Sequence, residues 1–196
     1  FNSTFVPNRK VKKMARILFS TYQKEDLLEL VGRLDRDYYE VIDELCRHAA
    51  IHASEVEISK INQSTILFLD LCKKLLGEIN SQVKMRRDIL IPYVHQLLKK
   101  AAINHSCKTC DENCDIEQEK RLRLIIDSHE TIKELLFRIQ QLAKPLYLET
   151  IQSISYKILR NEMMIIDTAL SELFYIEEVI LIPKVKEVQK QLNANS

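Results

Sequence analysis

The sequence has very little of what tight turns and β-sheets require. Only two glycines and four prolines occur in 196 residues, and there is no alternating run of valine, isoleucine and threonine. Long helices with few connections are therefore expected. No apolar run approaches the roughly 20 residues that cross a bilayer, so we expect no membrane contact.

The chain also lacks an excess of either charge. With 29 basic and 28 acidic residues, no general field draws it onto nucleic acid, and we expect no nucleic-acid contact. No serine, cysteine or aspartate constellation points to nucleophilic catalysis, and two glycines leave no phosphate-binding loop. These absences favour a protein that is not an enzyme.

The length and apolar content support one substantial core, since 46% of the 196 residues are hydrophobic. We expect an all-α antiparallel up-down four-helix bundle over residues 23–196. Residues 1–22 form an N-terminal segment with a short helix over 14–22, and 103–116 form a cysteine-containing loop. The sequence begins at Phe1 rather than at a methionine, as expected for a trimmed or processed product.

Apolar residues at three and four spacing predict the bundle helices. The first ends near 51–54, the second spans 64–101, the third 116–142, and the fourth runs from after Pro145 to about Leu192. The first stripe is Leu27, Leu30, Leu34, Tyr38, Val41 and Leu45; the second is Phe68, Leu75, Ile79, Leu90 and Leu97. The third is Leu122, Ile125, Ile132, Leu136 and Ile139; the fourth is Leu159, Met163, Ile166, Leu170, Leu173, Ile176 and Ile180.

Two stripes carry a charged residue six positions before a proline, Arg86 before Pro92 and Glu177 before Pro183. A buried unpaired charge costs several kcal/mol, so globular helices usually avoid one. His129 falls on the apolar side of the third helix. Pro92 lacks a backbone donor, and we expect a kink or break of the helix near it.

Three segments carry a family resemblance. They read QVKMRRDILIP at 82–92, HETIKELL at 129–136 and LFYIEEVILIP at 173–183. Their order and spacing resemble hemerythrin-like (HHE cation-binding) domains, most of all the di-iron proteins linked to repair of iron–sulfur clusters, with HxxxEExxLFP on the second helix, HExxxELL on the third and a related motif on the fourth. The resemblance implies a four-helix bundle and a bacterial cytoplasmic setting.

The same comparison implies a degenerate metal site. Gln82, Arg86 and Leu173 stand where the family has a histidine, a glutamate and a histidine. His129 and Glu177 keep the family's ligand chemistry. We expect no di-iron cluster, because a leucine cannot bind iron and an arginine repels it.

The first helix offers no clear ligand in this alignment. Its nearby candidates are Asp35, Asp37 and Tyr38, none of them a histidine.

Two interpretations of the charged residues remain. In one, Arg86 has replaced the positive charge of the metal, and its donors reach Glu177 and the neighbourhood of His129 and Gln82. In the other, both long side chains lie at the margins of their stripes and extend to solvent.

A second candidate site is His105, Cys107, Cys110 and Cys114, in the segment HSCKTCDENC. Its thiols and histidine could bind zinc, ligate an iron–sulfur centre with outside help, or form a redox disulfide. The alternative is an ordinary exposed loop.

Two functional classes follow. The first is a non-catalytic regulatory or binding module that uses a protein partner or a small ligand. The second, implied by the resemblance, is an iron- or redox-linked protein related to iron–sulfur cluster repair and to the response to nitric oxide or oxygen stress. Apolar residues around 14–19 would allow a homodimer.

Overall fold

The computed structural model describes residues 19–56, 63–103, 113–146 and 153–194. These residues are almost entirely helical, and no strand occurs among them. The fold is all-α, as the glycine-poor sequence predicts. None of the helices described is both long and apolar enough to span a membrane.

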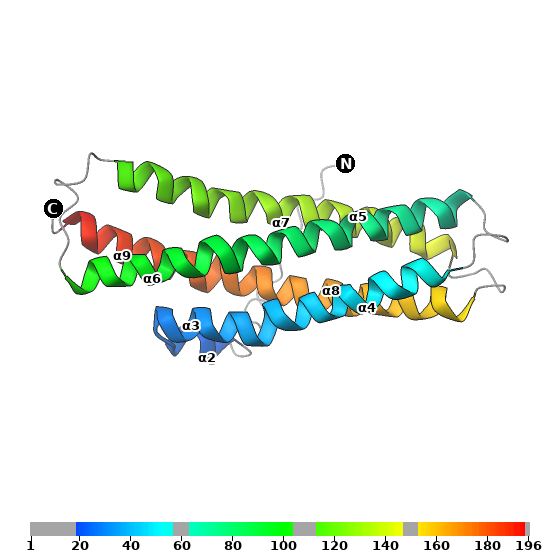
Figure 1. Ribbon diagram of the computed structural model, residues 1–196, viewed down its shortest axis with the longest axis horizontal. Helices are drawn as coiled ribbons and strands as arrows, with labels where there is room; N and C mark the ends of the chain where they lie inside the picture. Colours follow the sequence, from blue (N-terminus) through cyan, green and yellow to red (C-terminus); the bar gives the residue numbers. More distant parts are fainter. Residues whose placement is uncertain (1–18, 57–62, 104–112, 147–152, 195–196) are drawn as a thin grey trace, which may run out of the picture.

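Long helical rods lie side by side along the longest axis of the molecule (Figure 1). After the short helix α2 (Ser20–Lys24), the first rod joins α3 (Leu27–Leu34), the π-helical turn η1 (Asp35–Tyr39) and α4 (Glu40–Glu55). The second rod joins α5 (Gln63–Met85), the π-turn η3 (Arg86–Leu90) and α6 (Ile91–Ala102). The third rod is α7 (Asn113–Leu146), and the fourth joins α8 (Ile154–Ile176), the π-turn η5 (Glu177–Leu181) and α9 (Ile182–Ala194).

The rods pack unequally against one another. In one half of the molecule α4 packs against α5 and α8, and α5 packs against α7. In the other half α6 packs against α9 and α3. By contrast, α7 and α8 touch over a limited stretch. A seam is therefore left between these two helices.

Side-chain caps begin two of the helices. Asp26 accepts a hydrogen bond from the backbone N–H of Glu29 at 2.8 Å before α3, and Ser153 accepts one from Tyr156 at 3.2 Å before α8. Both satisfy a backbone donor that has no partner within the helix.

The predicted apolar stripes of the second, third and fourth helices form the core. All the residues predicted for them are buried, and His129 and Glu177 are buried with them. Cys46 and Cys72 are buried free thiols within this core. Burial raises the pKa of each thiol to about 12, so both stay protonated at neutral pH.

The stripe predicted for the first helix is buried through Tyr38, is wrong at Val41, and is only half-buried at Leu45. Val41 is 47% exposed, whereas Tyr39 and Ile42 are fully buried and Cys46 follows them into the core. The cause is η1, because a π-turn holds one residue more than an α-helical turn and rotates all later residues by one position. Counting at three and four spacing cannot anticipate that shift.

Of the kink or break expected near Pro92, the break does not occur, and the helix geometry changes in η3 just before the proline. The second rod passes through η3 directly into α6, where Pro92 occupies one of the first two positions. A proline is tolerated there because that N–H has no essential helical partner. Helix α6 thus continues to Ala102, and the departure from α-helical geometry lies just before the proline.

The N-terminal helix predicted over 14–22 is described only from Phe19 onward, where α2 begins at Ser20. The Phe19 ring packs against Tyr175 of the fourth rod, with centroids 5.0 Å apart. Residues 14–18 and most of the cysteine-containing loop lie outside the described residues.

Candidate functional site: a buried polar centre

A cluster of polar side chains interrupts the apolar core midway along the molecule. Arg86 is 1% exposed, and His129 and Glu177 are fully buried. With Tyr39 they form what we call the polar centre. Each of the four comes from a different rod, so the centre joins all of them.

Arg86 and Glu177 form a two-pronged ion pair. Arg86 Nε donates to Glu177 Oε1 at 2.7 Å, and Nη2 donates to Oε2 at 2.9 Å. The remaining nitrogen, Nη1, donates to the backbone carbonyl of Gln82 at 3.1 Å and to its Oε1 at 3.4 Å. The predicted contact between Arg86 and Glu177 is confirmed, and the alternative in which both extend to solvent is wrong.

His129 lies between two carboxylates. Its Nε2 is 2.6 Å from Glu177 Oε2, and its Nδ1 is 2.8 Å from Glu178 Oε1. Each ring nitrogen thus lies within hydrogen-bond distance of a carboxylate oxygen. The Phe174 ring stacks on it, with centroids 4.1 Å apart.

Tyr39 is the member of the centre that sequence reasoning missed. Its hydroxyl donates to Glu177 Oε1 at 2.9 Å, and its side chain is fully buried. Burial and the neighbouring Glu177 carboxylate raise its pKa well above the usual value, so the phenol remains a donor. Only recognition of the π-turn would have placed Tyr39, rather than Tyr38, on the inner face.

The three candidates proposed on the first helix do not reach the centre. Asp35 pairs with Arg87 at 2.6 Å, Asp37 with Arg33 at 3.5 Å, and Tyr38 donates to Glu172 at 3.2 Å. They lie on flanks of the rod that η1 turns away from the polar centre.

The π-turns position the charged residues. Arg86 is the first residue of η3 and Glu177 is the first residue of η5. Their carbonyls accept from N–H groups five residues later, at Ile91 and Ile182. The wider turns alter the register of each rod at the level of the polar centre, and single π-turns are frequent at functional sites. Because η1 has no proline after it, the prolines alone do not cause these turns.

Electrostatics keep the central carboxylate ionised. Burial would raise the pKa of Glu177, but the charge of Arg86 and the hydrogen bonds from His129 and Arg86 outweigh burial and lower the pKa to about 2. Burial likewise opposes ionisation of Glu178, and Lys133 and His129 outweigh it and lower its pKa. Both carboxylates therefore remain ionised at neutral pH.

The centre reaches the surface through His129. Glu178 is 38% exposed in its side chain, and its Oε1 also accepts from Lys133 Nζ at 3.0 Å. Lys133 pairs in turn with the exposed Glu130 at 3.1 Å. A chain of polar contacts thus runs from the buried Arg86 through Glu177, His129 and Glu178 to Lys133 and Glu130 at the surface.

The residues present do not fit a di-iron cluster. Leu173 is a buried apolar residue of α8, and the amide of Gln82 donates to Glu78 at 3.0 Å. Both oxygens of Glu177 already accept hydrogen bonds from Arg86, Tyr39 or His129. Among the residues described, no group of three or more histidine, cysteine, aspartate or glutamate side chains could hold a metal ion.

The second predicted site cannot be placed. His105, Cys107 and Cys110 lie outside the described residues, and Cys114 lies in the first turn of α7 without a described side chain. Zinc binding by this segment stays a prediction.

Comparisons with known proteins do not assign the chain to a family. No protein-family model matches the chain, and no curated protein matches it.

Proposed function

We propose that the chain is a hemerythrin-like antiparallel four-helix bundle, with a short extra N-terminal helix, in which side-chain charges have replaced the di-iron centre. It acts as a non-catalytic binding or regulatory module. The observation that carries the proposal is the buried guanidinium of Arg86, clamped at 2.7 and 2.9 Å onto Glu177. The resemblance assigns iron ligands to these two positions. In this chain one position holds the cation Arg86 and the other the carboxylate Glu177, and the two pair with each other.

Three of the four side chains of the polar centre are unsuited to acid–base catalysis, which supports a non-catalytic role. A general acid or base needs a pKa near the working pH, whereas the pKa of Glu177 is about 2 and that of Tyr39 is raised well above its usual value. Arg86 holds its proton even more firmly, since the Glu177 carboxylate outweighs burial and raises its pKa. At neutral pH none of these three groups exchanges protons readily.

Iron loading tests the proposal. Purified protein is incubated with ferrous iron in air, desalted, and measured for iron content and absorption. We expect no stoichiometric iron and no absorption from an oxo-bridged pair. Stoichiometric iron with such absorption would contradict the proposal and favour the iron- or redox-linked role.

A restoring variant tests the resemblance itself. Gln82→His, Arg86→Glu and Leu173→His together return three residues of the family pattern beside His129 and Glu177. We expect this triple variant to retain iron after desalting. The control, Arg87→Glu with Gln96→His, makes similar changes away from the centre and should retain none. A folded triple variant that binds no more iron than this control would contradict the resemblance.

A further inference from the structure

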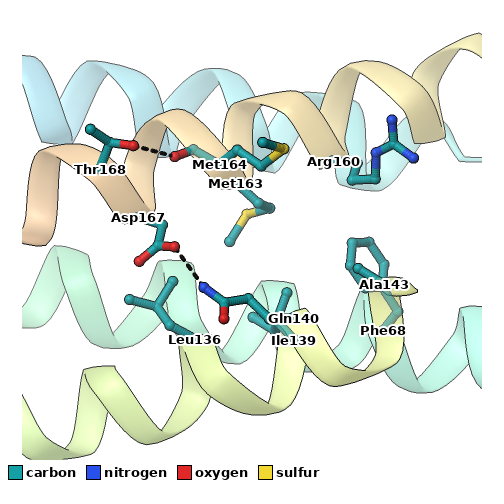
Figure 2. Close-up of a pocket in the computed structure, with 10 residues that line it drawn as sticks. All are labelled: Phe68, Leu136, Ile139, Gln140, Ala143, Arg160, Met163, Met164, Asp167 and Thr168. Atoms are coloured by element: carbon teal, nitrogen blue, oxygen red, sulfur yellow. Dashed lines mark hydrogen bonds between the residues drawn. The ribbon is translucent and has the colours of Figure 1, made fainter. Parts of the chain in front are cut away.

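A cleft lies along the seam between α7 and α8, where the two helices touch only over a limited stretch. Its volume is about 510 Å³. Leu136 and Ile139 of α7, Phe68 of α5 and Met163 of α8 contribute apolar side chains to its lining, and Met163 points into the gap between the helices (Figure 2). Pockets of roughly 300–1,000 Å³ with mainly apolar walls are typical of small-molecule sites.

One carboxylate lies on the wall of this cleft. Asp167 of α8 is half-buried and, among the described residues, accepts one hydrogen bond, from Gln140 Nε2 across the cleft at 2.7 Å (Figure 2). An ionised carboxylate can accept about four hydrogen bonds. In the described part of the chain, no lysine, arginine or histidine pairs with Asp167. The carboxylate is therefore a charged acceptor with spare capacity beside an apolar surface.

The opposite charge at the cleft is already engaged. Arg160, which also lines it, has an interaction of its own. Lys133, in the adjoining part of the seam, pairs with Glu130 and Glu178. An anionic ligand would meet the Asp167 carboxylate, and the cations described at the cleft already have interactions. A neutral apolar ligand would strip water from Asp167 without replacing its hydrogen bonds, which is costly.

From this arrangement we propose that the α7–α8 cleft binds a small organic amine, whose ammonium pairs with Asp167 and whose apolar body lies against Phe68, Leu136 and Met163. A charge-assisted hydrogen bond to a carboxylate is stronger than a neutral one, and partial burial strengthens it further. The thioether of Met163 adapts to ligands of different shape. The amine class follows from the charge of Asp167, with which no cation pairs among the described residues.

The cleft also adjoins the polar centre. A second hollow of about 310 Å³ shares Leu136, Gln140 and Asp167 with it and continues to Phe174 and Glu178. Phe174 and Glu178 both contact His129. This inference goes beyond the proposed function and does not depend on the loss of iron, because none of the cleft residues stands at a former ligand position.

Calorimetric titration with three probes of equal chain length tests the proposal: octylamine, octanol and octanoate, each below its micelle concentration. We expect octylamine to bind at least tenfold more tightly than octanol, and octanoate not to bind. Asp167→Asn keeps a hydrogen-bond acceptor for Gln140 but removes the charge. It should weaken octylamine binding at least tenfold and leave octanol binding unchanged.

Two further variants keep the test decisive. Asp127→Asn removes an exposed carboxylate of α7 away from the cleft and should leave octylamine binding unchanged. Ala143→Phe adds bulk to the cleft wall and should abolish binding of both octylamine and octanol. Failure of octylamine to bind, equal binding of octylamine and octanol, or an Asp167→Asn variant that binds octylamine normally would each overturn the proposal. A dimer in sedimentation that Ala143→Phe dissociates would show that a second copy covers the cleft, and would also overturn it.

Discussion

Arg86→Met removes the guanidinium from the polar centre and keeps an unbranched side chain that suits a helix. Glu177 then stays fully buried, with Tyr39 and His129 as its remaining partners. Breaking one side of a buried ion pair costs about 3–5 kcal/mol. We expect the lower end, about 3 kcal/mol at neutral pH, because the two other partners still hold the carboxylate.

Urea unfolding followed by far-UV circular dichroism measures this loss. Thermal unfolding gives a second measure. For a chain of this size, 1 kcal/mol corresponds to about 2–4 °C in melting temperature, so we expect the melting temperature of the variant to be about 6–12 °C lower. The neighbouring Arg87→Met is the matched control. Arg87 pairs with Asp35 at side-chain exposures of 34% and 39%, and losing such an exposed pair costs less than about 1 kcal/mol.

The double variant Arg86→Met with Glu177→Gln shows whether the loss comes from an uncompensated charge. Removing both charges should restore at least half of the stability lost in Arg86→Met, because no unpaired carboxylate is left in the core. The reasoning is refuted if Arg86→Met costs no more than Arg87→Met. It is also refuted if the effects of Arg86→Met and Glu177→Gln simply add.

Two other predictions concern the same centre. The folded pKa of Glu177 is about 2, below its usual 4.5, so its contribution of about 3 kcal/mol is present above pH 4.5 and is lost as the pH falls toward 2. Urea midpoints at a series of acid pH values should fall more steeply for the wild type than for Glu177→Gln, and equal slopes would contradict the assignment. Tyr39→Phe should cost about 1–2 kcal/mol in urea unfolding, because it removes a buried donor to a charged carboxylate. Tyr38→Phe, which removes a longer, half-buried bond to Glu172, should cost less, and the reverse order would contradict the register given by η1.

Much of the fold follows from the sequence because burial repeats with the helical period. The stripes beginning at Phe68, Leu122 and Leu159 are buried throughout. Charge placement was equally informative. A stripe that tolerates Arg86 and Glu177 must provide each with a partner, and the structure shows that they are each other's partners.

The π-turns are the part that the sequence does not reveal. A π-turn depends on long-range packing, and no residue type in DRDYY at 35–39 requires one. Its consequence is large, since it puts Tyr39 in place of Tyr38 at the polar centre and moves Ile42 rather than Val41 into the core. The participation of Glu178 was missed for a related reason, because it is half-exposed and meets His129 from the edge of the fourth rod.

The polar centre is better explained by its effect on the alignment of the rods than by a contribution to stability. Apolar replacements of a buried ion pair are often neutral or stabilising, so the presence of Arg86 and Glu177 is weak support for a gain in free energy. Leucine and isoleucine layers, however, allow rods to slide, and a slip of one helical turn moves a residue by about 5.4 Å. Such a slip would break contacts of 2.7 and 2.9 Å between the second and fourth rods. His129 applies the same constraint to α7, which touches α8 only over a limited stretch. The network therefore fixes how α7 and α8 face each other, and that relation sets the shape of the cleft around Asp167.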